Sequence, residues 1–176
     1  MADPDKNSEA GRSGAAEEAD AMTIHDVPLV QPPIVPWISF RDQRCWEAVL
    51  HLGRKVAWKA DTVIQRPEDE VAGIFLLRSG TIKVAAASPG GLQRTLWLMG
   101  EGSVLGEAAM FGRHPYMHEI VATEDCVAYE FSRATVMDTL LVQHPQVSAA
   151  LLSNMAAKCY IMSTQVEDTT FLSAAQ

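Results

Sequence analysis

The sequence has few cysteines and no paired ones: Cys45, Cys126 and Cys159 stand far apart in a chain of 176 residues. With no CxxC pair and no Cys/His cluster at ligand spacing, neither a disulfide framework nor a zinc site is indicated. No apolar run reaches the ~20 residues of a membrane span, and the first residues lack the order of a signal peptide. We therefore expect a cytoplasmic protein that does not contact a membrane.

Positive charge is also scarce, with 14 Lys and Arg against 22 Asp and Glu and a net charge of −8. DNA or RNA binding needs a basic surface that displaces counterions, so this chain is not expected to bind nucleic acid by itself. The motifs GxSxG, HExxH, the P-loop and a GxGxxG in a suitable context are absent. We therefore expect that the protein is not an enzyme and that it binds no metal and no cofactor.

Two cofactor-dependent alternatives remain open. A cupin-like metal enzyme needs a His/Glu cluster on its strands, and the β-rich segment offers only His114 and His118, both in a loop. A haem sensor could use one of the same two histidines, although surface histidines are commoner than axial ligands. An iron–sulfur sensor needs four cysteines and is excluded by the count.

The composition divides the chain into four parts. Residues 1–21 are rich in Ala, Gly, Ser and acids and predict a disordered acidic tail. Residues 22–39 carry four prolines and predict an extended arm. Residues 40–144 predict a β-rich domain with a short helix at each end, and residues 145–172 predict one long helix that begins at Pro145.

Between residues 54 and 132 the apolar pattern repeats every two residues and is interrupted by turns rich in Gly, Pro and acids. Short β-branched or aromatic segments of this kind predict strands. Many short strands with regular turns favour a sandwich, a barrel or a jelly roll. The predicted strands are 54–59, 62–66, 73–80, 81–88, 93–99, 103–106, 118–124 and 126–132.

The long helix carries apolar residues at alternating spacings of three and four, which is the a/d pattern of a coiled coil. At 1.5 Å per residue it would be about 40 Å long, more than a small β-domain can cover. We therefore expect a homodimer, although the same residues could instead pack on their own β-domain. The expected dimer-interface residues are Leu152, Met155, Cys159, Met162, Val166 and Thr169.

This order of elements resembles the sensor half of the Crp/Fnr superfamily of bacterial transcription regulators. The matching segments are "IFLLRSGTIKV" (74–84), "GEGSVLGEAAMF" (100–111), 124–147 and 154–172. The resemblance implies a mainly β fold with helices: a double-stranded β-helix or jelly roll of the cyclic-nucleotide-binding type over 40–144, then a dimerisation helix over 145–172. In the family a helix-turn-helix domain follows, so DNA contact is expected only through a C-terminal domain that this chain does not contain.

The resemblance also implies where a ligand binds. In members that bind cyclic AMP, a Gly-Glu loop and an Arg-Ser pair hold the phosphate and the ribose. Gly106 and Glu107 match the loop, but the Arg-Ser position falls on Tyr116 and Met117. Losing an arginine contact to a phosphate costs a few kcal/mol, so cyclic AMP is not the expected effector. Arg113 is the nearby residue that could replace the missing arginine.

An apolar pocket with one Lys and one Tyr suits a small aromatic or organic acid. Lys158 is the cation of the helix stripe formed with Leu151, Met155 and Met162, and it also matches a weak motif of the halophenol-sensing branch. Lys158 could instead extend to solvent, and Glu107 could simply cap its loop. The expected effector-binding residues are Gly106, Glu107, Ala108, Met110, Arg113, Tyr116, Met117, Met155, Lys158, Met162 and Ser163.

The resulting interpretation is the effector-sensing and dimerisation domain of a Crp/Fnr-type regulator. It would bind a small acid and pass a shift of the dimer helix to a DNA-binding domain. The alternatives are a cyclic-nucleotide sensor that uses Arg113, the cupin-like enzyme, and a pure dimerisation module. A redox role for Cys159 would need a reactive thiol, and buried apolar cysteines are usually inert.

Overall fold

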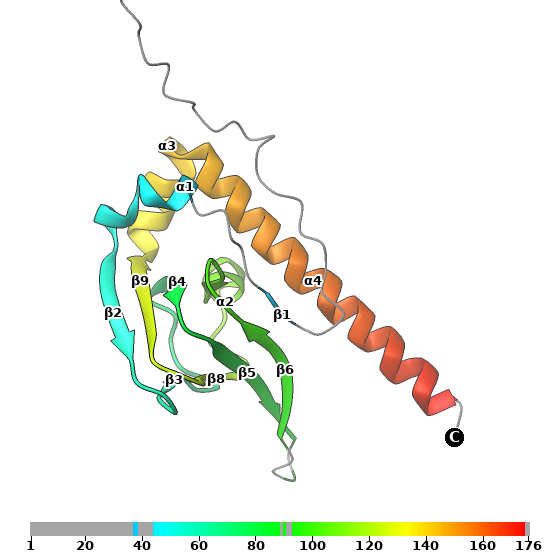
Figure 1. Ribbon diagram of the computed structural model, residues 1–176. Helices are drawn as coiled ribbons and strands as arrows, with labels where there is room; N and C mark the ends of the chain where they lie inside the picture. Colours follow the sequence, from blue (N-terminus) through cyan, green and yellow to red (C-terminus); the bar gives the residue numbers. More distant parts are fainter. Residues whose placement is uncertain (1–36, 39–43, 89, 91–92, 175–176) are drawn as a thin grey trace, which may run out of the picture.

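The computed structural model describes residues 37–38, 44–88, 90 and 93–174, with side chains described only between residues 44 and 167. A β-roll of two packed sheets is joined to a long helix that runs along one side of it and past its strands (Figure 1). This is the predicted fold: a mainly β domain of the cyclic-nucleotide-binding type followed by a long helix. The tail predicted over 1–21 and most of the arm predicted over 22–39 lie outside the described residues.

Each of the eight predicted strands is present. Their alternating apolar residues form the inner faces of the two sheets, and the Gly- and acid-rich segments between them form the turns. The strands are β2 (Arg54–Trp58), β3 (Val63–Gln65), β4 (Gly73–Ser79), β5 (Ile82–Ala87), β6 (Gln93–Met99), β7 (Val104–Leu105), β8 (Glu119–Ala122) and β9 (Cys126–Ser132).

One sheet has five strands in the order β1-β6-β5-β8-β3, and the other has four in the order β2-β9-β4-β7. Neighbouring strands are antiparallel except for β1 (Trp37–Ile38), which pairs in parallel with β6. β1 is the described part of the predicted proline-rich arm, and it also contacts the long helix. β1 therefore lies at the edge of the sheet that faces this helix.

The helices lie at one end of the roll and along its side (Figure 1). The predicted first helix is two short pieces, α1 (Arg44–Glu47) and η2 (Leu50–Leu52). The predicted second helix is a π-helical segment, η3 (Thr135–Leu140), that continues into α3 (Leu141–Gln143). His144 interrupts it, and α4 (Pro145–Ala174) begins at the next residue, as the proline at that position predicts.

Two apolar cores hold the parts together. One lies between the sheets and includes Leu77, Met99 and Ile120, with Ile161 of α4 packed against it. The other lies between β4, β9 and the helices. It includes Phe131 of β9, Leu140 of η3 and residues of α4. α4 is thus anchored to both cores through its buried face.

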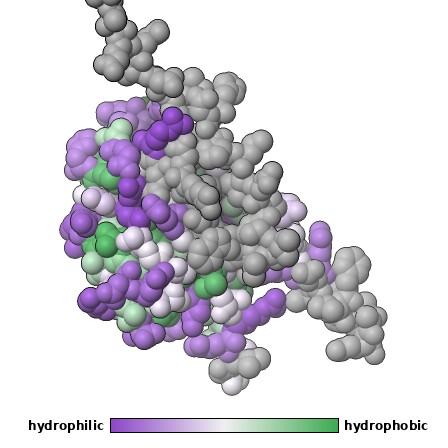
Figure 2. Space-filling model, viewed as in Figure 1, coloured by the Kyte–Doolittle hydropathy of each residue, from purple (hydrophilic) through white to green (hydrophobic). Residues whose placement is uncertain are grey.

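The surface drawn in Figure 2 is mixed: among the coloured residues, hydrophobic patches are small and lie between hydrophilic ones. By contrast, α4 exposes several large apolar side chains to solvent. No helix in the described part of the chain is both long enough and apolar enough to cross a membrane.

Candidate functional site

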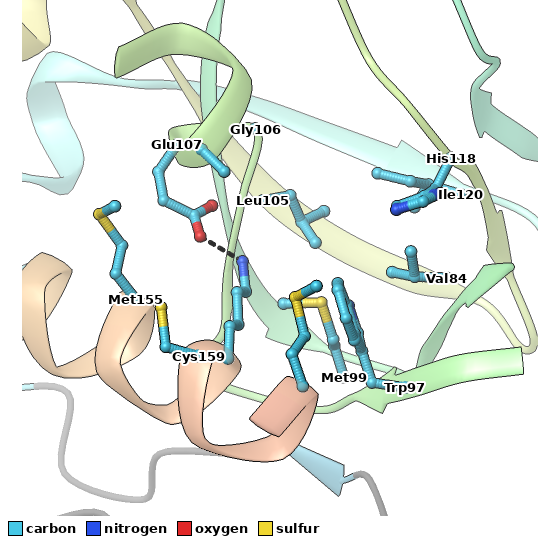
Figure 3. Close-up of a pocket in the computed structure, with 13 residues that line it drawn as sticks. Val84, Trp97, Met99, Leu105, Gly106, Glu107, His118, Ile120, Met155 and Cys159 are labelled. Carbon is cyan, nitrogen blue, oxygen red and sulfur yellow. Dashed lines mark hydrogen bonds and ion pairs between the residues drawn. The ribbon is translucent and has the colours of Figure 1, made fainter. Parts of the chain in front are cut away.

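A cavity of about 190 Å³ lies between the β-roll and α4, beside the first residues of α2 (Glu107–Gly112). Glu107 and Met155 lie at one end of it, and His118, Ile120 and Val84 lie at the other (Figure 3). Most of its wall is apolar. The lining residues are Val84, Trp97, Met99, Leu105, Gly106, Glu107, Ala108, His118, Ile120, Met155, Lys158, Cys159 and Met162.

Gly106 places Glu107 at the cavity. It has a φ of 84°, in the left-handed region that favours glycine, and it caps the start of α2. A Cβ atom here would lie 2.5 Å from the hydroxyl oxygen of Tyr116 and 2.9 Å from the carbonyl oxygen of Gly73. Both the backbone conformation and the available space therefore require glycine. Glu107, the next residue, lines the cavity between the roll and α4.

Glu107 forms an ion pair with Lys158, which reaches it from α4 (dashed line, Figure 3). The Glu107 side chain is 0% exposed and that of Lys158 is 13% exposed, so water screens the pair only weakly. The Lys158 ammonium also donates a hydrogen bond of 2.8 Å to the carbonyl oxygen of Val104. The pair connects α2 to α4 across the cavity.

The second carboxylate oxygen of Glu107, Oε2, is buried and accepts no hydrogen bond from any described residue. Asn154 Oδ1 is likewise buried and unpaired, but Asn154 does not line the cavity. Buried polar atoms are nearly always satisfied, so an unpaired carboxylate oxygen needs an explanation. Because Glu107 lines the cavity, this oxygen is a candidate acceptor for a bound molecule.

At the other end of the cavity, the rings of Trp97 and His118 meet edge to face, with centroids 6.3 Å apart and an interplanar angle of 89°. Burial lowers the pKa of His118 below its ordinary value, since the charged imidazolium loses hydration. This end is therefore aromatic, and near neutral pH it carries no charge.

Six of the residues expected at the effector site line this cavity: Gly106, Glu107, Ala108, Met155, Lys158 and Met162. The others lie elsewhere. Met117 is 67% exposed, Ser163 is also exposed, and neither lines the cavity. Met110 is fully buried in the core between the roll and the helices.

Tyr116 lies in the core between the sheets, behind Gly106, and is not a lining residue. Its backbone is fixed by hydrogen bonds with Glu68 and Asp69. Burial, with a smaller contribution from the negative charge of Glu107, raises the pKa of Tyr116. Tyr116 thus packs behind the loop at Gly106.

Arg113 lies on the other side of α2. It is the left-handed C-cap of that helix and borders a separate polar hollow with Glu68, Glu70 and Arg133. Arg133 donates a hydrogen bond of 2.7 Å to the carbonyl oxygen of Met110 and so fixes the end of α2. The guanidinium that could replace the missing phosphate contact is not at the cavity.

The sequence analysis did not identify the β-strand part of the lining, which includes Val84, Trp97, Met99 and Ile120. These residues follow the ordinary inward alternation of strands, and that pattern does not separate cavity wall from filled core. His118 was considered only as a haem ligand or as a ligand of a cupin-like metal site. A buried histidine next to tryptophan has no local sequence signal, because β6 and the loop before β8 are brought together by the sheet.

The expected dimer-interface residues divide between the exposed face of α4 and the side of α4 that borders the cavity. Leu152 and Val166 are 68% and 62% exposed. Met155, Cys159 and Met162 border the cavity, and the last two are also exposed. The side chain of Thr169 lies outside the described residues.

Gln165 donates a 2.6 Å hydrogen bond to the carbonyl oxygen of Leu96 and so ties α4 to β6. Within the described residues, no group of three or more His, Cys, Asp or Glu side chains is placed to hold a metal ion.

Comparisons with known proteins agree with this geometry. The family described as "Cyclic nucleotide-binding domain" matches residues 55–142, half of the chain. Among solved structures, the c-di-GMP-responsive global regulator CLP of Xanthomonas campestris has a TM-score of 0.68 at 17% identity, over 74% of this chain and 66% of that one. No curated protein matches.

Two further structures are similar in fold. CprK in complex with o-chlorophenolacetic acid has a TM-score of 0.63 at 18% identity, over 78% of this chain and 57% of that one. The catabolite activator protein of Thermus thermophilus has a TM-score of 0.64 at 20% identity, over 74% and 61%. The chain thus spans less than two thirds of the length of these three structures.

Proposed function

This chain belongs to the cyclic nucleotide-binding domain family, and from that premise we propose that it is the sensor domain of a Crp/Fnr-type transcription regulator. Its effector is a small aromatic or organic acid, not cyclic AMP. The observation that carries the proposal is the cavity between roll and α4, which is apolar except for the Lys158–Glu107 pair and the neutral His118 end.

The size and lining of the cavity support a single-ring ligand. Sites for drug-sized molecules are typically about 300–1,000 Å³, and this cavity is about 190 Å³. Trp97 and the methionines offer flat and adaptable apolar contacts for an aromatic ring. The polar pair at one end then fixes the orientation of the ligand's acidic group.

A cyclic nucleotide is the second candidate, because the family is defined by that ligand. Its cyclic phosphate carries a full negative charge that needs a guanidinium or an equivalent donor. Arg113 borders a different hollow, and the ammonium of Lys158 is already paired with Glu107. The arrangement therefore favours the small acid.

The dimer is also part of the proposal. α4 exposes Leu152, Met162 and Val166, and three of the expected interface residues border the cavity as well. A second α4 packed here would bury those side chains and close the open side of the cavity. A ligand that contacts Met155 and Met162 would then act on the dimer contact directly.

This placement gives a route from binding to output. A ligand shifts a dimer equilibrium only if it binds one arrangement of the helices more tightly than the other. Lys158 on α4 and Glu107 on α2 both line the cavity, so a ligand that contacts the pair favours one position of α4 relative to α2. In a longer regulator the shift would reach a C-terminal DNA-binding domain.

The test is isothermal titration calorimetry of the 176-residue chain against phenol, benzoic acid and cyclic AMP. We expect saturable binding of at least one aromatic probe and no saturable binding of cyclic AMP. Lys158→Ala should weaken the aromatic probe about tenfold or more, since it removes a charged donor. Lys55→Ala, at an exposed lysine of β2, is the matched control. Tight cyclic AMP binding would contradict the proposal.

A further inference from the structure

The charges of the cavity already cancel. Lys158 has three N–H donors, of which one is used on Glu107 and one on the carbonyl oxygen of Val104. One donor remains for a ligand, and so does the unpaired acceptor Oε2 of Glu107. The pair therefore offers one donor and one acceptor side by side, with no net charge.

A ligand group with one acceptor and one donor fits this arrangement without breaking the pair. A hydroxyl group and a protonated carboxyl group both qualify. An ionised carboxylate does not, because it has no hydrogen to give to Oε2 and would add a negative charge next to that of Glu107. Within the described residues, the cavity has no second cation to balance it.

We infer that the cavity takes its effector in neutral form: an O–H of the ligand donates to Glu107 Oε2 while the ligand oxygen accepts from Lys158. An acid that is ionised in solution therefore binds together with one proton. This rests on the proposed function and specifies the chemical form of the ligand. The effector class narrows to phenols, alcohols and acids bound as the un-ionised acid.

The other titratable groups near Glu107 do not supply the positive charge that an ionised ligand would need. Lys158 and Cys159 on α4 and His118 on the loop before β8 line the cavity, and Tyr116 lies behind Gly106. Asp69 and Glu130 act on Tyr116 and add negative charge. His118 could take up the proton in place of the ligand. The experiment must therefore distinguish a proton on His118 from a proton held between the ligand and Glu107.

The experiment compares phenol with benzoic acid on the 176-residue chain, by calorimetry between about pH 6 and pH 8. Phenol stays neutral over this range, as a tyrosine side chain does, whereas benzoic acid is ionised like an Asp or Glu side chain. We expect a constant affinity for phenol. The apparent affinity for benzoic acid should fall about tenfold per pH unit, because one proton binds with it.

Glu107→Gln should invert this selectivity. The glutamine amide oxygen accepts the hydrogen bond from Lys158, and the amide N–H groups take the place of Oε2. Lys158 then keeps an unbalanced positive charge. Phenol should then bind about 10- to 100-fold more weakly, while benzoate binds as the anion, more tightly and with no pH slope. Glu167→Gln, at an exposed residue of α4, is the matched control.

His118→Gln should keep the pH slope of benzoic acid; a slope that disappears there would place the proton on His118 and overturn the inference. Benzoate affinity that is flat with pH in the unmodified chain overturns it too, and this test remains if Glu107→Gln does not fold. Saturable benzoate binding with a flat profile leaves the proposed function standing. Absence of binding by both probes removes the proposed function and this inference with it.

Discussion

Replacing Lys158 by methionine should destabilise the domain strongly, because it leaves the Glu107 carboxylate buried without a counter-charge. Glu107 is 0% exposed and Oε2 already lacks a partner, so the second oxygen would lose its partner as well. Breaking a buried ion pair from one side costs about 3–5 kcal/mol. Small domains are stable by about 5–15 kcal/mol, so this is a large share of the total.

The double variant Glu107→Leu/Lys158→Met should recover most of that loss. It removes both charges and leaves apolar side chains next to Met155 and Leu105, which already line the same cavity. Apolar replacement of a buried pair is often neutral or stabilising. We expect the double variant to be at least about 2 kcal/mol more stable than Lys158→Met alone.

Urea denaturation followed by tryptophan fluorescence measures these differences, with Lys55→Met as the control at an exposed lysine. If the effects of Glu107→Leu alone and Lys158→Met alone add up to that of the double variant, the pairing of Glu107 with Lys158 is refuted.

Three further outcomes follow from the structure. Met117→Arg should not create cyclic AMP binding in calorimetry, because residue 117 is exposed and outside the cavity; saturable binding would show that the loop rearranges. Leu152→Asp with Val166→Asp should weaken dimerisation at least about 30-fold in sedimentation equilibrium, since both side chains are exposed on the outer face of α4, and an unchanged dimer would place the interface elsewhere. Burial lowers the pKa of His118, so the folded state binds fewer protons than the unfolded state, and its contribution to stability is lost as pH falls through about 6.5. His118→Gln should therefore lose less stability than the unmodified chain between about pH 7 and pH 5 in thermal melts, and equal losses would contradict the assignment.

The sequence located the strands and the long helix well, because their signals are local. Alternation of apolar residues fixed the positions of β4, β5, β6 and β9, and Pro145 fixed the start of α4. The left-handed Gly106 before Glu107 also follows from a short motif. The resemblance then supplied the placement of that loop next to the long helix.

Whether Tyr116 and Met117 are buried or exposed could not be predicted from the sequence. They are neighbours in the loop between α2 and β8, and the folded structure turns their side chains to different surroundings. Tyr116 is consequently buried behind Gly106, while Met117 faces solvent. No local pattern decides which of the two side chains faces inward, since both are apolar enough for either side.

The amino-acid order alone determines which faces of the strands and of α4 are apolar, because each periodicity involves only residues a few positions apart. The tertiary structure alone decides that Lys158 meets Glu107, 51 residues earlier in the chain, and that one carboxylate oxygen is left unpaired. Those facts depend on how α4 is seated against the roll, and this seating is set by the packing of two apolar cores whose members no local pattern connects.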